Sequence, residues 1–446
     1  MTKPAHTQVQ LPRPSTRFTI PHFRWVVCAL LLAASTVNYV DRLTISVLKP
    51  HLENVLNISE SDYGWIVFAF QLAYAVMLSV SGLAIDRLGT RLGYAISITW
   101  WSIATMMHAL ARGAVSFGAA RFLLGAGEAG NFPAAVKAVA EWFPKRERAL
   151  ATGIFNSGPT LGAIIAPPIV VWVTLHWGWQ KAFILTGVVG FIWLIFWMAL
   201  YRLPREHPLI ADSELKIIEA GDGEEEELSG ASRTPWQSFL VSRGAWGFFL
   251  GKTLTDTVWW FYIFWLPSYL KQSRGFSLKE IGYFSWIPFL ISGVGSVGGG
   301  WLSGYLIRRG WSLNRARKTV MALSAFCMPC GIIAVFVPSP WWALVLIGVS
   351  ASAHQGWMAN LYTIVSDIFP KRDVGSVIGL GGTGGSIGGM IFALVTGYTL
   401  QWFHTYVPIF IITGILHPLA FGVVHLVIPK IEPLSPVALR DATPAN

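Results

Sequence analysis

Long apolar segments recur along almost the whole chain, separated by short polar stretches. Each segment has about 20 residues, which is enough for a helix to cross a hydrocarbon core of roughly 30 Å. The pattern therefore predicts an all-α membrane protein with twelve transmembrane helices. The expected spans are 24–47, 62–84, 92–111, 115–139, 149–174, 181–202, 244–271, 279–305, 318–337, 341–366, 375–400 and 406–429.

One long polar stretch, residues 203–243, divides the spans six and six and contains EEEE at 224–227. An acidic run of this kind is typical of a solvated linker, and a binding tail is the alternative. We therefore predict five regions. These are an N-terminal tail (1–23), an N-terminal six-helix half (24–202), the linker (203–243), a C-terminal six-helix half (244–429) and a C-terminal tail (430–446).

The two halves share a sequence repeat. FPKRERALATG (143–153) follows the fourth span and FPKRDVGSVIG (369–379) follows the tenth, and five of their eleven letters match. Internal repeats of this kind are typical of transporters built from two pseudo-symmetric units.

Composition agrees with a membrane protein, because 53% of the residues are hydrophobic and only 13% are charged. Of the 33 basic residues, 23 lie on one side of the predicted membrane, 6 lie on the other and 4 fall within spans. This asymmetry predicts that both termini and the linker are cytoplasmic. The same asymmetry accounts for the net charge of +10, so this charge does not indicate a nucleic-acid-binding protein. The first apolar segment is too long for a cleaved signal peptide.

The stretch GLAIDRLGTR (82–91) closely resembles the loop signature of the major facilitator superfamily. In that family the loop helps to hold the inner gate. The resemblance therefore implies a gating role for Gly82, Asp86, Arg87, Gly89 and Arg91. The second half keeps only GGWLSGYLIRRG (299–310), with Gly304 at the acidic position, so we expect an asymmetric gate.

Four further motifs resemble the anion:cation symporter family, which includes hexuronate and galactonate permeases. They are NYVDR (38–42), RFLLGAGEAGNFPA (121–134), EWFPKRERA (141–149) and FNSG (155–158). The resemblance implies proton-coupled import of a sugar-acid anion by alternating access. It makes Asp41 and Glu128 the protonatable pair and Arg42 the carboxylate-binding residue, and it places Tyr39 and Tyr74 at the substrate. We expect Arg121 to share the carboxylate with Arg42, and Asn156 to contact the substrate.

The sequence departs from the galactonate type at Pro159, where that type has a substrate-binding Gln. This departure leaves the exact sugar acid open. The resemblance makes a hexuronate the first expectation, with an aldonate or an aldarate next. Residues 158–162 also weakly resemble an antiporter signature, so a proton-antiport exporter of organic anions or drugs is one alternative. A permease-like receptor that senses the ligand without net transport is another.

The segment GAGEAG (125–130) fits the G-x-G-x-x-G dinucleotide fingerprint, but it lies inside the predicted fourth span with no strand before it. We expect no nucleotide and no other cofactor. Instead of binding a nucleotide, the glycines are expected to allow neighbouring helices to approach closely.

Glu128 within this segment is informative because a carboxylate inside a membrane is costly. Arg121, seven residues earlier, lies on the same helix face, so a structural ion pair between these two side chains is the alternative to proton coupling. Arg42 is expected near the outer end of the first span, where its guanidinium could hold a carboxylate in bidentate fashion or simply reach toward water.

In the C-terminal half, His354, Trp357 and Asn360 are spaced to share one face of the tenth span, and we expect them to contact the substrate. A core histidine is the alternative for His354. Lys252 and Asp256 are four residues apart and are expected to neutralise each other.

The sequence contains no motif for a nucleophile, a catalytic triad or a phosphate loop, so we do not expect an enzyme. Cys327 and Cys330 form a C-x-x-C without a second ligand pair, so no metal is expected either. The partners predicted are a small organic anion, protons and the lipid bilayer of the inner membrane. The chain is expected to function as a monomer.

Overall fold

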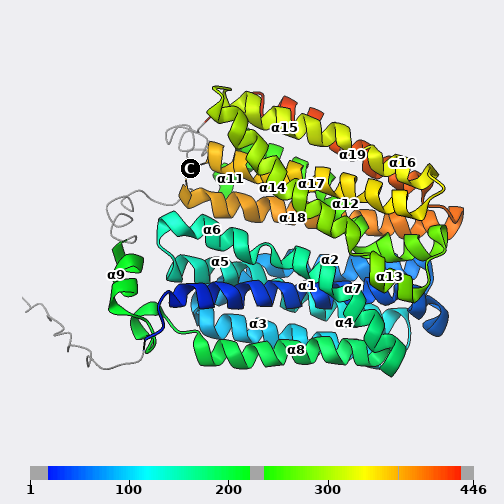
Figure 1. Ribbon diagram of the computed structural model, residues 1–446, viewed down its shortest axis with the longest axis horizontal. Coiled ribbons are helices and arrows are strands. Elements are labelled where there is room, and N and C mark those ends of the chain that lie inside the picture. The colour runs from blue at the N-terminus through cyan, green and yellow to red at the C-terminus, as the bar shows by residue number, and fades with distance from the viewer. Residues whose placement is uncertain (1–18, 221–235, 370, 433–446) are drawn as a thin grey trace, which may run out of the picture.

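The computed structural model describes residues 19–220, 236–369 and 371–432, which form two helical bundles lying side by side (Figure 1). All regular elements in these ranges are helices, in agreement with the predicted all-α class. Eight stretches of described helix are long and apolar enough to cross a membrane by length and composition alone.

The N-terminal half contains six crossings, several of them built from two consecutive helices. Its elements are α1 (Phe23–Leu56), α2 (Glu60–Leu88), α3 (Thr90–Met107) with η1 (His108–Leu110), α4 (Ala114–Glu128), α5 (Asn131–Trp142), α6 (Lys145–Phe155), α7 (Gly158–Trp177) and α8 (Trp179–Leu200).

The C-terminal half repeats this arrangement. Its elements are α12 (Arg243–Arg274), α13 (Leu278–Phe284), α14 (Ile287–Arg308), α15 (Leu313–Cys327), α16 (Cys330–Phe336), α17 (Pro340–Ile368), α18 (Lys371–Phe403) and α19 (Val407–Val427). In the sequence, the two halves are separated by η2 (Pro204–Glu206), α9 (Asp212–Ala220) and α11 (Trp236–Val241).

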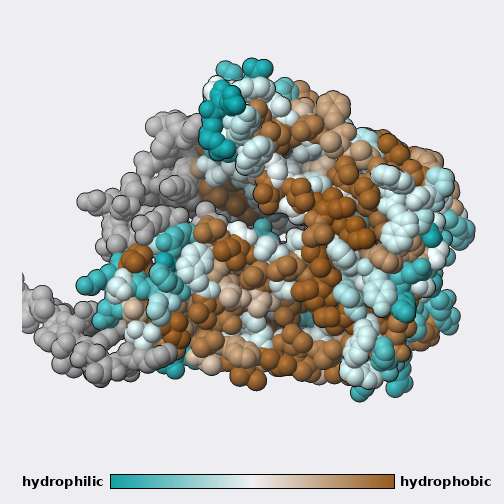
Figure 2. Space-filling model, viewed as in Figure 1, coloured by the Kyte–Doolittle hydropathy of each residue, from teal (hydrophilic) through white to brown (hydrophobic). Residues whose placement is uncertain are grey.

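We call the end of the molecule where α1 begins and α9 lies the linker end, and the other the opposite end (left and right in Figure 1). Figure 2 shows brown apolar residues over much of the visible face, with a recess between the two halves toward the linker end. The exposed apolar surface suits contact with lipid rather than water.

The repeated FPKR motifs occupy matching places at the linker end. The backbone N–H of Phe143 donates to the Val139 carbonyl at 3.0 Å and ends α5, and that of Phe369 donates to the Val365 carbonyl at 2.9 Å and ends α17. A new helix begins two residues later in each half. The sequence repeat therefore marks the same structural corner twice.

The first helix is longer than the expected span of 24–47, because α1 continues to Leu56. Pro50 lies inside it without ending it. As a result Asp41 and Arg42 lie in the middle of α1, and not near its outer end as the sequence suggested.

The glycines of GAGEAG bring α4 against two neighbouring helices, as expected. A Cβ atom added at Gly125 would lie 3.1 Å from the Phe70 carbonyl carbon of α2, and one at Gly127 would lie 2.8 Å from the Trp101 nitrogen of α3. The helix ends at Glu128 and resumes as α5 at Asn131. These glycines serve close helix packing.

The start of the predicted linker is folded against the N-terminal half, which corrects the expectation of a solvated stretch over its whole length. Glu214 of α9 is buried and accepts hydrogen bonds from the backbone nitrogens of Phe23 at 2.8 Å and Arg24 at 3.1 Å. It also forms a 2.8 Å ion pair with the Arg24 side chain. A carboxylate on the first N–H groups of a helix stabilises it. The EEEE run lies outside the described residues.

Polar contacts join the two halves at the opposite end. The side chain of Gln272 donates to Glu60 at 2.8 Å, Lys271 donates to the Pro50 carbonyl, and Trp65 donates to the Tyr398 hydroxyl at 3.1 Å. The ion pairs given for the described residues at the linker end lie within one half, between α1 and α9, or between η2 and α9. The three contacts named first therefore join the two halves at the opposite end.

Candidate functional site

A buried ion pair joins α1 to α4 in the middle of the N-terminal half. The Arg42 Nε and Nη2 atoms both donate to Glu128 Oε2, at 2.9 and 2.7 Å. Arg42 is 3% exposed and Glu128 is fully buried. Both donors fall on one oxygen, and Oε1 of Glu128 has no hydrogen-bond partner among the described residues. The guanidinium fork is therefore engaged, and it is the Glu128 carboxylate that is not fully satisfied.

Aromatic rings surround the Arg42 guanidinium on several sides. The ring centroids lie 4.6–5.3 Å from its Cζ atom and belong to Tyr39, Phe70, Tyr74 and Trp260. Three of them come from the N-terminal half, and Trp260 comes from α12 of the C-terminal half. Cation–π attraction of this kind is strongest where water is excluded.

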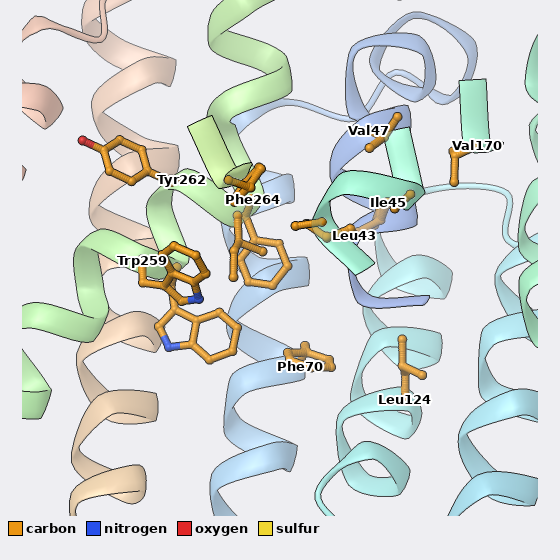
Figure 3. Packing of buried hydrophobic residues seen from close by; sticks show 14 of the residues in the cluster. Leu43, Ile45, Val47, Phe70, Leu124, Val170, Trp259, Tyr262 and Phe264 are labelled. Atoms are coloured by element: carbon orange, nitrogen blue, oxygen red, sulfur yellow. The ribbon is translucent and has the colours of Figure 1, made fainter. Parts of the chain in front are cut away.

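The aromatic residues of α2 and α12 meet in the interior between the halves, as the labelled Phe70, Trp259 and Phe264 in Figure 3 show. The rings of Phe70 and Phe264 lie 6.3 Å apart and nearly perpendicular. Both halves thus contribute to the walls around Arg42.

Arg121 is fully buried but does not pair with Glu128. Its Nη2 donates to the backbone carbonyl of Arg42 at 3.0 Å, while its Nε and Nη1 have no hydrogen-bond partner among the described residues. The seven positions between Arg121 and Glu128 separate them by about 10 Å along the helix, whereas Arg42 approaches Glu128 from a neighbouring helix. The structural alternative, an ion pair between Arg121 and Glu128, is therefore wrong, because Glu128 pairs with Arg42 instead.

Asp41 is fully buried, and within the described residues neither of its oxygens has a hydrogen-bond partner. Its neighbour Arg42 pairs elsewhere, as expected for side chains that diverge around a helix. The site thus holds two guanidinium groups and two carboxyl groups, and only one pair of them is joined.

The predicted C-terminal contacts are buried on α17. His354 Nδ1 lies 3.2 Å from His417 Nε2 of α19, and the His354 ring stacks on Trp259 at 5.4 Å. The Asn360 amide donates to the backbone carbonyls of Gly299 at 3.1 Å and Gly356 at 3.0 Å. Asn360 therefore also holds α17 against α14.

Trp357 is fully buried and contacts the His417 ring with centroids 5.6 Å apart. Asn156, at the end of α6, is exposed. The structure therefore brings Tyr39, Arg42, Tyr74, Arg121 and Glu128 together, with Asp41 next to Arg42 on α1, and leaves Asn156 outside this cluster.

The predicted gating residues lie at the linker end, where α2 turns into α3. Gly89 has a φ of 79°, a left-handed conformation that favours glycine. Asp86 is exposed and forms a 2.9 Å ion pair with Lys137 of α5, and Arg91 donates to the Met198 carbonyl of α8. Gly82 and Arg87 lie in the last two turns of α2, just before Gly89. These contacts all lie within the N-terminal half.

Lys252 and Asp256 form the expected pair one turn apart on α12, at 2.7 Å. Lys252 also donates to the Tyr362 hydroxyl at 2.9 Å. Among the described residues, no group of three or more His, Cys, Asp or Glu side chains could hold a metal ion.

Sequence reasoning missed three residues of this region: Gln71, Trp260 and His417. Gln71 and His417 are polar residues inside apolar spans, which is a usable signal. Trp260 carries no such signal, because the chain has 22 tryptophans.

The family model described as Major Facilitator Superfamily matches residues 31–362 and 310–443 of the chain. The chain belongs to the major facilitator superfamily. It is therefore a multi-pass membrane transporter with twelve transmembrane helices in two pseudo-symmetric halves, and not an enzyme.

Among curated members of the superfamily, the chain is 36% identical over 381 residues to the hexuronate transporter of Escherichia coli (strain K12), covering 85% of this chain and 88% of that one. It is 31% identical over 408 residues to a probable galactarate/D-glucarate transporter of the same strain, covering 88% and 92%.

Solved structures of other superfamily members share the fold. A crystal structure of a D-xylose-proton symporter matches with a TM-score of 0.73 at 16% identity, covering 92% of this chain and all of that one. At this identity the likeness concerns the fold alone.

Proposed function

We propose that this transporter imports a sugar-acid anion together with protons, with a hexuronate as the first candidate and an aldonate or aldarate next. The observation that carries the proposal is the Arg42–Glu128 pair, a guanidinium fork held by one carboxylate oxygen in a buried site. A planar carboxylate of the substrate fits the same fork. Relatives named for hexuronate and for galactarate/D-glucarate support this substrate class.

Substrate and proton are coupled through competition for Arg42. Protonation of Glu128 removes its charge and weakens its hold on the guanidinium, so the substrate carboxylate takes its place. The two unpartnered nitrogens of Arg121 offer a second cationic contact. Asp41, buried close by without a hydrogen-bond partner among the described residues, provides the second protonation site. Release of the protons on the other side restores the Arg42–Glu128 pair and expels the anion.

Tyr39 and Tyr74 line the substrate site beside Arg42. The C-terminal half contributes His354, Trp357 and Asn360 to this site. Asn156, at the end of α6, contacts the substrate outside the central cluster. The loop residues Gly82, Asp86, Arg87, Gly89 and Arg91 take part in the inner gate. We place both termini and the linker in the cytoplasm, with the five regions bounded as in the sequence analysis. The contacts at the opposite end then close the outer face, and a single chain carries out the cycle.

The test is uptake into proteoliposomes under an imposed pH gradient, across a panel of hexuronates, aldonates and aldarates. Uptake driven by an inward proton gradient supports symport. Efflux driven by the same gradient identifies the exporter alternative. Saturable binding without any flux identifies the sensor alternative. Reporter fusions at each terminus test the orientation, and a terminus on the outer face would overturn it.

A further inference from the structure

One buried polar side chain of the site region has no role in the transport cycle proposed above. Gln71 of α2 is fully buried, and within the described residues neither its Oε1 nor its Nε2 has a hydrogen-bond partner. Buried amides in folded proteins are almost always hydrogen-bonded. The unpartnered amide of Gln71 therefore indicates a ligand group that forms hydrogen bonds with it during transport.

Gln71 lies at nearly the same level along the molecule as Arg42. Measured from the opposite end of the molecule, Arg42 lies about four turns along α1, Gln71 about three turns along α2, and Trp260 about four turns along α12. One helical turn advances by about 5 Å, so these positions differ by no more than that in depth. The amide is thus level with the carboxylate-binding site.

Gln71 also adjoins a ring that covers the Arg42 guanidinium. A Cβ atom added at Gly389 of α18 would lie 2.7 Å from Gln71 Nε2 and 2.9 Å from Trp260 Cγ, so these two side chains meet over the same glycine. The Trp260 ring centroid lies 5.3 Å from Arg42 Cζ. Gln71 belongs to the N-terminal half, and Trp260 and Gly389 belong to the C-terminal half, so the amide lies where the halves meet.

The chemistry of the amide selects among ligand groups. A glutamine offers both a donor and an acceptor, and so does a sugar hydroxyl. A carboxylate only accepts, so it would leave Oε1 of Gln71 unpaired. We propose that Gln71 binds a hydroxyl group of the sugar acid whose carboxylate is held by Arg42, and so determines specificity among sugar acids that differ at that hydroxyl. This inference rests on the proposed function.

The experiment compares wild type with Gln71→Leu, in which an apolar side chain of similar size replaces the unpartnered amide. Such a replacement does not leave a buried polar group behind, so the variant is expected to fold. The probes are the best-transported sugar acid of the panel and its monodeoxy analogues, each lacking one hydroxyl. Binding is measured by competition against uptake in proteoliposomes. Gln401→Leu, the same change at an exposed position of α18, is the matched control.

We expect wild type to bind one deoxy analogue about tenfold more weakly than the parent. Gln71→Leu should bind the parent about tenfold more weakly than wild type does, and should bind that analogue with the affinity that wild type has for it. The control should behave as wild type with every probe.

Two patterns would overturn the inference alone. Wild-type affinity of Gln71→Leu for the parent and all analogues would show that the amide holds at most water. An equal loss for the parent and every analogue would show a structural role without recognition of one hydroxyl. Absence of any sugar-acid binding or transport by wild type would instead overturn the proposed function, and this inference with it.

Discussion

The two halves each hold an ion pair in their interior, and the two pairs are built differently. Arg42 of α1 reaches across to Glu128 of α4, a residue 86 positions away in sequence. Lys252 of α12, the first crossing of the other half, pairs with Asp256 one turn further along its own helix. The first pair depends on how two helices are placed, and the second depends on one helix alone.

The pairs also differ in what they leave unsatisfied. Around Arg42, polar atoms of Asp41, Arg121 and Glu128 lack hydrogen-bond partners within the described residues. Lys252 instead contacts both Asp256 and the Tyr362 hydroxyl, and within the described residues neither charged side chain has a buried atom without a partner. An unsatisfied pair can exchange partners with a ligand, whereas a satisfied local pair is suited to a structural role. The asymmetry therefore favours substrate and proton chemistry in the N-terminal half.

The largest expected effect comes from Glu128→Gln set beside Asp256→Asn. Gln at 128 imitates the protonated carboxyl permanently, so uptake driven by a pH gradient should fall more than tenfold while exchange of substrate across the membrane persists. Asp256→Asn should keep gradient-driven uptake. Both rates are measured in the same proteoliposomes, with counterflow as the exchange assay. Gradient-driven uptake by Glu128→Gln at the wild-type rate would refute the coupling role.

A second test compares Arg42→Lys with Lys252→Arg. Lysine at 42 keeps the charge but loses the planar fork, so substrate affinity should fall about 10- to 100-fold. Lys252→Arg keeps a cation beside Asp256 and should change substrate affinity little. Substrate binding to purified protein measures both. Near-normal affinity in Arg42→Lys would place the carboxylate on other residues.

The third expected effect concerns stability. Lys252→Met leaves Asp256, which is 15% exposed, without its cation and should lower the free energy of unfolding by at most about 3 kcal/mol. The double variant Lys252→Met, Asp256→Leu removes both charges and should recover most of that loss, because a buried pair replaced by apolar residues is often close to neutral. Thermal unfolding in detergent measures each variant. A double variant less stable than the single one would mean that the pair does more than neutralise itself.

The smallest expected effect involves the aromatic rings over each cation. The Phe70 ring lies 5.1 Å from Arg42 Cζ and 4.8 Å from Arg121 Cζ, so Phe70→Leu should weaken substrate binding by about 1 kcal/mol, roughly fivefold. The Tyr362 ring lies 4.8 Å from Lys252 Nζ, and Tyr362→Leu should leave substrate affinity unchanged. Competition binding at fixed pH separates the two outcomes.

The fold could be predicted largely from sequence because long apolar runs and a repeated motif are local signals. The Lys252–Asp256 pair could be predicted for the same reason, since both residues lie one turn apart on one helix. The Arg42–Glu128 pair could not, because its geometry depends on the packing of α1 against α4. The pairing suggested by the sequence, Arg121 with Glu128, ignored the distance that two turns impose along a helix.

Other misses have equally specific causes. Gln71 carries no charge, so a search for intramembrane ions passed over it. The docking of α9 was overlooked because the acidic run at 224–227 dominated the interpretation of the linker. The signal was present in Ile210, Glu214 and Ile218, which recur every fourth residue and are all buried.

The capping of α1 by Glu214 shortens the tether between the halves. Since α9 is fastened to the first helix, residues 203–220 travel with the N-terminal half as one body, and only the segment 221–235 connects α9 to α11. A segment of that length reaches at most about 50 Å when fully extended. Progressive deletion within 221–235 therefore sets an upper limit on how far the two halves can separate at the linker end, whereas detaching α9 from α1 would lengthen the tether.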